Sequence, residues 1–288
     1  MMDCSCNKGF HTLKDVEKVL HNLRKADPAG VLVDQKKFYD DMHRRFIVMK
    51  DTVNKEVLQQ DGLGLTNAVL LSSGSMNGVT DSERLLAFDS WMAGLIASTI
   101  LFNGEAEAAK WTDSYLIQAW DKGAHHAVSQ LEDPELDQEP SDLPETLSIA
   151  TAAGAVAAVL LTNAWSEMEG IAAGLKQRAS RAVTDGLLKK QNPKQITEAL
   201  QSVINETENR RASVLVHMET MRAAIRGATQ TLRLNRISSV RVIAEWQTMQ
   251  DARVCPQCRA NEGKVFSLEE IEALIPLHVM CRCWFRIV

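Results

Sequence analysis

The chain has 288 residues, of which 45% are hydrophobic and 5% aromatic, and its formal net charge at pH 7 is -5. This length allows one or two domains with a sizeable core, and the weak overall charge favours neither nucleic acid nor a membrane as partner. Six cysteines are too few for a secreted disulfide scaffold of this length, and the first residues lack a basic and apolar signal segment, so we expect synthesis in a reducing cytoplasm.

The first part of the chain is predicted to be helical, because apolar residues recur there at intervals of three and four positions. The expected helices run from Thr12 to about Ala26, from Gln35 to Gln60, from a cap at Asp81 or Ser82 to Phe102, and from Glu105 to Leu131. Residues 61–80 are rich in Gly, Ser and Asn and are predicted to form a loop. His125 and His126 are interpreted as ordinary helix surface.

An acidic segment interrupts the helices. Residues 131–148 hold seven Asp or Glu, no Lys or Arg, and three prolines, which predicts a linker or surface loop. The following stretch, Ile149–Trp165, is almost wholly apolar, but it is short for a membrane span and has no basic flanks. We therefore expect a buried helix there.

Three further helices and a small α+β region are expected downstream. The helices run from Ser166 to about Lys190, from Pro193 to about Thr207, and from Asn209 to Asn235. Alternating apolar residues after Ser239 predict a strand, and Val265–Phe266 predicts a second one. Ser267 is expected to cap a helix over Leu268–Leu274.

Positive charge is concentrated in one region. Between Ala173 and Arg241 there are thirteen Lys and Arg against five Asp and Glu, a local net charge of about +8. The spacing of Arg222, Arg226 and Arg233 places them on one side of the long helix. This side is either a solvated helix face or a surface that contacts DNA phosphates without reading the bases.

The C-terminal region carries a pattern of metal ligands. Cys255 and Cys258 are followed after nineteen residues by His278, Cys281 and Cys283. Two close pairs of soft ligands joined by such a spacer predict a structural zinc site with no open position for a substrate. Five donors compete for four places, and the fourth ligand is either His278 or Cys283. The alternatives are a reduced thiol cluster without metal and a disulfide formed later.

Two arguments favour His278 as the fourth ligand. Its spacing from Cys281 equals that between Cys255 and Cys258. In an extended segment the side chains of Cys281 and Cys283 would point to opposite faces. Near the cluster, Asp251 is expected to cap a turn through backbone N–H groups, and Gly263 to supply a turn with positive φ. Cys4 and Cys6 belong either to a mobile tail or to the metal site.

The order of several motifs resembles the Mu-F-like minor head proteins of tailed bacteriophages, also called phage head morphogenesis proteins. The terminal signature is Trp246, Asp251, Cys255, Cys258, Gly263, His278, Cys281, Arg282 and Cys283. Upstream, the similar segments are Lys37–Phe46, Trp111–Tyr115 with Ala119 and Gly123, Asp185–Leu187, and Asn192–Ile196. The family usually has Arg-Thr-Glu on its long helix, where this chain has His217, Met218 and Glu219.

The resemblance implies a low-copy virion protein that acts inside the head near the portal vertex, in assembly and in handling of the genome. The implied partners are the portal protein, other head proteins and packaged double-stranded DNA, with no membrane involved. It implies no enzymatic activity, and we assign no catalytic residue. The alternatives are a zinc-dependent nuclease or toxin-type enzyme, which needs an open zinc position, and a cytoplasmic DNA-binding regulator, which needs a recognition helix.

The sequence thus predicts a mainly α protein, with a multi-helix body and a small C-terminal α+β knuckle stapled by zinc. Four consecutive regions are expected. These are an N-terminal helical region (1–130), an acidic Pro-rich linker (131–148), a helical and locally basic region (149–238), and the metal-binding knuckle (239–288).

Overall fold

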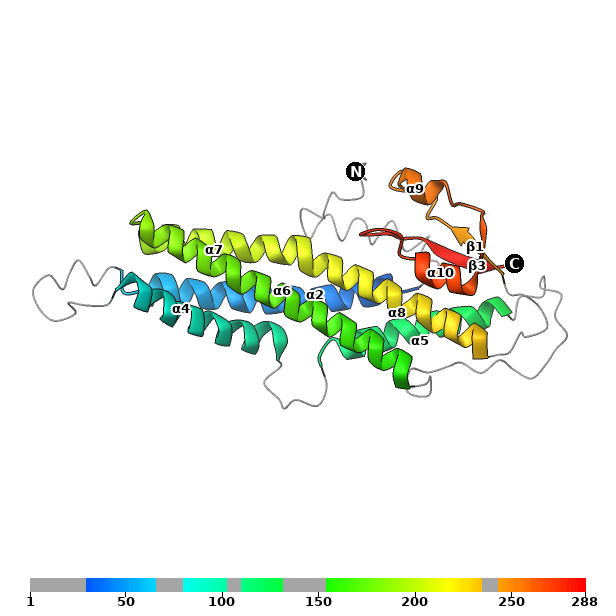
Figure 1. Cartoon of the computed structure of the whole chain (residues 1–288), viewed down its shortest axis with the longest axis horizontal. Coiled ribbons are helices and arrows are strands. Elements are labelled where there is room, and N and C mark those ends of the chain that lie inside the picture. The colour runs from blue at the N-terminus through cyan, green and yellow to red at the C-terminus, as the bar shows by residue number, and fades with distance from the viewer. Residues whose placement is uncertain (1–29, 66–79, 103–109, 132–153, 235–242) are drawn as a thin grey trace, which may run out of the picture. The chain divides into compact units, whose positions relative to one another are not determined.

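The computed structural model describes residues 30–65, 80–102, 110–131, 154–234 and 243–288 (Figure 1). The long helices are α2 (Leu32–Val53), α4 (Asp81–Ile96), α5 (Asp113–Leu131), α6 (Gly154–Leu188), α7 (Pro193–Thr207) and α8 (Ser213–Leu234). The C-terminal region holds β1 (Ile243–Gln247), α9 (Pro256–Arg259), β2 (Val265–Ser267), α10 (Leu268–Leu274) and β3 (Trp284–Ile287). The prediction of a mainly helical protein with a small C-terminal sheet is confirmed.

Some predictions fall outside the described residues. They are the helix at 12–26, Cys4 and Cys6, and the acidic linker after Leu131. Most of the loop at 61–80 and the start of the strand expected after Ser239 also lie outside them.

Capping residues decide where two of the helices begin. Thr80, and not Asp81 or Ser82, caps α4, because its hydroxyl accepts the Glu83 N–H at 3.3 Å while its own N–H donates to the Glu83 carboxylate at 2.7 Å. Asn192 and Gln195 form the same reciprocal pair at the start of α7, where Pro193 occupies the first turn as predicted.

Two helix boundaries differ from the prediction. From Gly154, where the described residues resume, the two segments predicted as Ile149–Trp165 and from Ser166 onward form the single helix α6. This helix buries one face only, since Leu160 is 1% exposed and Val159 is 53% exposed. The backbone also stays helical between α7 and α8, through the π-helical turn η4 (Glu208–Ala212). No Gly or Pro stands at this junction, so nothing in the local sequence ends the helix.

The chain divides into two compact units, each built from separate stretches of sequence. The first comprises Met1–Phe38, Thr112–Ala164 and Val214–Val288, and the second comprises Tyr39–Trp111 and Trp165–Ser213. This division differs from the four consecutive regions expected from the sequence, because α2 and α6 each contribute residues to both units.

In the first unit, α5 and α8 approach each other at their backbones. A Cβ added to Gly123 would lie 1.9 Å from the carbonyl oxygen of Ala224, and one added to Gly227 would lie 2.1 Å from that of Trp120. Trp120 is fully buried beside this contact. The start of α2 joins the same unit through the stacked rings of Phe38 and Tyr115, whose centroids are 4.8 Å apart.

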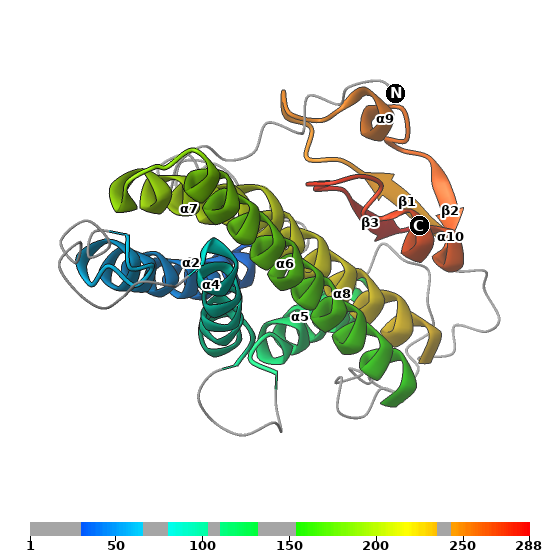
Figure 2. The same ribbon diagram turned by 60° about the vertical axis from the view of Figure 1, so that its left-hand side comes forward.

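The C-terminal module of the first unit comprises residues 243–288. Its strands form an antiparallel sheet in the order β2-β1-β3, in which Ala244 pairs with Phe266 on one side and with Ile287 on the other. Trp246, Trp284 and Phe285 are at most 1% exposed and form its core. Figure 2 shows α10 next to the C-terminal half of α8, with α9 farther from that helix. The strand β3 was not predicted.

The second unit contains helices, joined by turns, and no strand among its described residues. Besides parts of α2 and α6, it holds α4, α7, η4 and the π-helical turns η2 (Asn54–Gln59) and η3 (Ala97–Leu101). The predicted apolar stripe of α2 is confirmed, since Met42, Phe46, Met49 and Val53 are all fully buried. The helix expected from Glu105 begins at Asp113, and Trp111 instead donates its indole N–H to the Ile100 carbonyl at 2.9 Å.

Among the described residues, one helical segment, Asp81–Leu101, is long and apolar enough to cross a membrane by length and composition alone. This is weak evidence, because core helices of soluble proteins meet the same criterion.

Candidate metal centre

The first pair of ligands lies at the start of α9. Cys255 occupies the N-cap position, and its sulfur accepts the backbone N–H of Cys258 at 3.4 Å. Pro256 fixes the first helical residue. Because the turn is this tight, the two sulfurs lie on the same side of it, and both contact His278 Nε2. Both cysteines are buried.

The second group of ligands follows α10 on an irregular loop. The Cys281 N–H donates to the His278 carbonyl at 3.0 Å and closes a turn, in which Met280 has a φ of +60°. Few residues other than Gly adopt this left-handed conformation, so surrounding contacts must hold the turn in place.

The two groups converge on one point. His278 Nε2 lies 3.1 Å from Cys255 Sγ and 3.0 Å from Cys258 Sγ, and the sulfurs of Cys258 and Cys281 are 3.9 Å apart. Around a tetrahedral zinc ion, ligand atoms stand about 3.6 Å (sulfur to nitrogen) and about 3.8 Å (sulfur to sulfur) apart. The sulfur pair is close to this spacing, whereas the sulfur–nitrogen pairs are shorter. The five predicted donors form two groups that share Cys258 and could hold a metal ion, and thiolate and imidazole donors suit zinc.

The ring of His278 is oriented as a ligand. Its Nδ1 lies 2.8 Å from the Val279 carbonyl, which can only accept a hydrogen bond, so Nδ1 carries the proton. In the neutral ring Nε2 then has a free lone pair, and this atom faces the two sulfurs. A hydrogen bond of this kind on the second ring nitrogen is usual for a metal-binding His.

Cys283 also reaches the cluster. The sulfurs of Cys258, Cys281 and Cys283 lie within 4.8 Å of one another. The argument that Cys281 and Cys283 point to opposite faces was therefore wrong, because residues 281–283 precede β3 and are not part of a strand. Cys258 belongs to this group and also to the group of Cys255 and His278, so the choice of the fourth ligand stays open.

The thiols of the cluster influence one another. Hydrogen bonds from the Cys258 and Cys283 thiols hold the pKa of Cys281 well below its usual range. The hydrogen bond with Cys281, followed by one with Cys283 and by burial, raises the pKa of Cys258. One thiolate thus forms readily, and it is the form that binds a metal.

Two predicted structural residues take the expected roles. Asp251 Oδ1 accepts the Arg253 N–H at 2.9 Å, and Gly263 has a φ of +73°. Asp251 also accepts two hydrogen bonds of 2.7 Å from Arg282, the residue between Cys281 and Cys283. This bidentate pair ties the turn before the first ligand pair to the loop of the second, and it lowers the pKa of Asp251.

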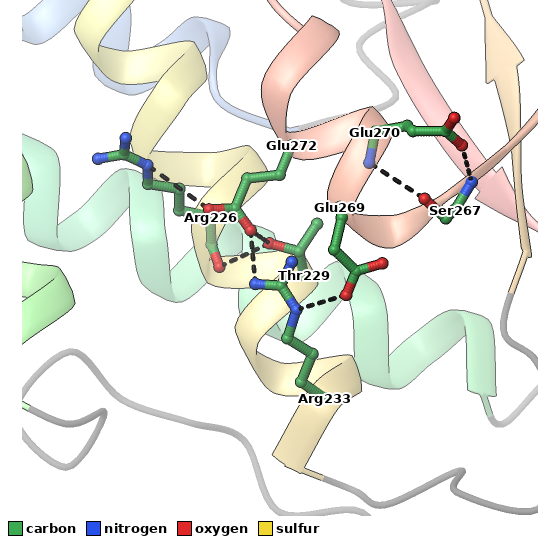
Figure 3. A network of polar contacts seen from close by, with 7 residues as sticks. All are labelled: Arg226, Thr229, Arg233, Ser267, Glu269, Glu270 and Glu272. Carbon is green, nitrogen blue, oxygen red and sulfur yellow. Dashed lines mark hydrogen bonds and ion pairs between the residues drawn. The ribbon is translucent and has the colours of Figure 1, made fainter.

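The arginines expected to contact DNA are paired with carboxylates of the same unit. Arg222 pairs with Glu219 on its own helix. Figure 3 shows that Glu272 of α10 contacts both Arg226 and Arg233 of α8, at 3.9 Å from Arg226 Nε and 2.6 Å from Arg233 Nη1. Thr229 donates to Glu272 at 2.9 Å, and Arg233 also pairs with Glu269. These contacts attach the C-terminal module to α8, and contact with DNA stays a prediction.

A buried polar cluster in the second unit was not predicted. Glu208 on η4 is 3% exposed, and its carboxylate accepts a hydrogen bond of 3.1 Å from Lys50 Nζ. The same carboxylate makes a short contact with His43, and both partners lie on α2. Burial, with the charges of Glu208 and Asp40, raises the pKa of Tyr39 to about 12. Sequence reasoning gave no signal for Glu208, because its partners lie about 160 residues earlier in the chain.

Other residues near the module were also missed. His126 is half-buried against Trp284 of β3, with ring centroids 5.5 Å apart, so the interpretation as ordinary helix surface was wrong for it. Four residues later on α5, the side-chain oxygen of Gln130 accepts the backbone N–H of Ile287 at 2.7 Å. His217 on α8 is 7% exposed and contacts the carbonyl oxygen of Cys281. A histidine among apolar helix residues was the only signal for this contact.

Comparison with known families gives a match. Residues 175–286 match the family described as Phage Mu protein F like protein, a segment that begins within α6 and ends within β3. It includes all five donors of the cluster. The resemblance to the Mu-F-like head morphogenesis family is therefore confirmed over these residues, and it indicates a phage head-related, virion-associated protein. No curated protein and no solved structure matches the chain.

Proposed function

We propose that this chain is a low-copy minor capsid protein of a tailed bacteriophage, which acts inside the head near the portal vertex during assembly and genome handling. The match of residues 175–286 to the Phage Mu protein F like family carries the proposal. The predicted signature residues support it, since Asp251, Gly263 and the five donors form one compact module.

The proposed cofactor is one structural zinc ion, held by Cys255, Cys258 and Cys281 with His278 or Cys283 as fourth ligand. The soft donor set, and the presence of Cys258 in both groups of donors, support this assignment. The proposed role is not enzymatic, because four nitrogen and sulfur ligands leave no open position at which zinc could activate water or bind a substrate.

The proposed partners are the portal protein and other head proteins, with no membrane involved. Packaged double-stranded DNA is a further proposed partner, contacted without regard to sequence by the arginines of α8. The half-exposed side chain of Arg222 supports this contact best, since Arg226 and Arg233 are less exposed and lie against α10.

A quantitative mass-spectrometric inventory of purified virions tests the proposal. We expect peptides of this chain at a few copies per virion, measured against the major capsid protein. Protease treatment of intact virions should spare them, and crosslinking should join them to the portal protein. A protein found only in extracts of infected cells, and absent from virions, would instead be a cytoplasmic regulator.

A further inference from the structure

The loop that carries His278, Cys281 and Cys283 contacts α8 directly. His217, in the first half of that helix, places Nε2 2.6 Å from the backbone carbonyl oxygen of Cys281. A carbonyl oxygen can only accept, so Nε2 carries the proton and donates. This N–H is thus used on the backbone of Cys281, a proposed metal ligand.

This contact satisfies two groups that would otherwise be costly to bury. His217 is 7% exposed, and Val216, Thr220 and Met221, which are near it along α8, are also buried. The carbonyl of Cys281 lies on a segment outside the described helices and strands. Buried backbone carbonyls nearly always have a hydrogen-bond partner, and removal of one partner leaves the other buried without a hydrogen bond.

The contact also fixes the direction of the Cys281 peptide. On one side of this loop, Arg282 forms its bidentate pair with Asp251. On the other side, His217 holds the carbonyl of the preceding residue. Together they hold the loop in which Met280 has its left-handed conformation. The position of the Cys281 sulfur follows from the same peptide, since its side chain has one rotatable bond before sulfur.

We propose that His217 is a positioning residue for the metal centre: its Nε2–H holds the Cys281 carbonyl so that the Cys281 thiolate meets the ion in binding geometry. The proposal rests on the structural zinc proposed above. It also explains why a polar residue is buried on this apolar face of α8.

The test compares the zinc affinity of full-length variants by competition with a chromogenic chelator. His217→Phe keeps a planar ring and removes the donor, whereas His217→Gln places an amide N–H near the position of Nε2. Loss of a hydrogen bond that orients a ligand lowers metal affinity about 10- to 100-fold. We expect a loss of this size for His217→Phe, and an affinity within about 3-fold of wild type for His217→Gln.

A matched control separates positioning from general attachment of the module. Glu272→Gln weakens the contacts of α10 with Arg226 and Arg233 and leaves the ligand loop untouched (Figure 3). It should bind zinc with wild-type affinity. The absorption spectrum of the cobalt(II)-substituted protein, which reports coordination geometry, should change for His217→Phe only.

Several outcomes would overturn the inference. One is a wild-type zinc affinity in His217→Phe. Another is an equal loss of zinc affinity in the Phe and Gln variants, which would show that the shape of the side chain matters and its N–H does not. A wild-type protein that binds no zinc would overturn the metal proposal as well, so the two failures are distinguishable. If His217→Phe does not fold, the imidazole 15N shifts of the wild type decide: they should show a protonated Nε2 and change on chelation, and unchanged shifts refute the role.

Discussion

The carbonyl oxygen of Ala224 on α8 occupies the space in which a side chain on Gly123 of α5 would begin, 1.9 Å from the position of a Cβ. Gly227 has the same relationship with Trp120. Helices α5 and α8 therefore meet at two glycines, one on each helix, and the contact depends on the absence of side chains at both positions.

Gly123→Ala should therefore destabilise the first unit, because the new methyl group meets backbone atoms that cannot rotate away. We expect a loss of at least about 2 kcal/mol in the free energy of unfolding, measured with denaturant. Gly170→Ala on α6 is the control, since nothing lies within 4 Å of its added Cβ. The control should gain about 0.5–1 kcal/mol through helix propensity. A stability of Gly123→Ala equal to or above that of the wild type, as expected for the control, would contradict the close approach.

Glu208→Ala should destabilise the second unit, because Lys50 and His43 would lose their shared carboxylate inside the unit. We expect a loss of about 2–3 kcal/mol in the free energy of unfolding. Glu206→Ala, two residues earlier, removes an exposed carboxylate that pairs with Arg178 and Arg210. This control should cost less than about 1 kcal/mol. Equal effects would show that Glu208 is no more important than a surface charge.

The second unit should lose stability at high pH through Tyr39. Its pKa is raised to about 12 when folded, above the unfolded value near 10, so folding favours the neutral phenol. The stabilisation is complete below about pH 10 and is lost as pH rises towards 12. The absorbance of tyrosinate should show this late titration, and Tyr39→Phe should remove it. A titration complete by pH 10.5 would refute the buried, negatively charged surroundings of this phenol.

Cys258→Ser should abolish metal binding, because Cys258 belongs to both groups of ligands. Binding of structural zinc contributes on the order of 10 kcal/mol in small modules, so residues 246–288 should unfold while the helices persist. Elemental analysis measures the metal content, and hydrogen exchange measures the unfolding of residues 246–288. Both are applied to Cys258→Ser and to the wild type before and after chelation. Less than about half an equivalent of metal in the reduced, folded wild type would refute the zinc assignment.

Glu272→Gln tests contact with DNA. This carboxylate pairs with Arg226 and Arg233, so its neutralisation should raise the affinity for duplex DNA of any sequence if these arginines meet phosphates. Reversal of Arg222 should lower the slope of log affinity against log salt by about 0.9 for each lost contact. Glu245→Gln on β1 removes an equal charge from a different pair and is the control. Equal affinities in all variants would contradict contact with DNA and leave Arg226 and Arg233 as attachment sites of α10 only.

Local signals in the sequence were enough to place several elements. Ser267 and Glu270 form a capping box at the first turn of α10, and Asn192, Pro193 and Gln195 fix the start of α7. Such interactions span three or four residues, so the chain's own order determines them. The five donors of the cluster were likewise found from spacing, because the geometry of a metal site restricts the distance between its ligands along the chain.

Tertiary structure decided which residues meet across longer distances. The sequence by itself determined the helical body, the α+β module and its candidate metal ligands, because periodicity, capping and ligand spacing act within short stretches. It did not reveal that Glu208 pairs with Lys50, that His217 contacts the Cys281 carbonyl, or that Arg226 and Arg233 both pair with Glu272. Each of these contacts joins residues at least about 40 positions apart, and only the packing of the helices and the sheet brings them together.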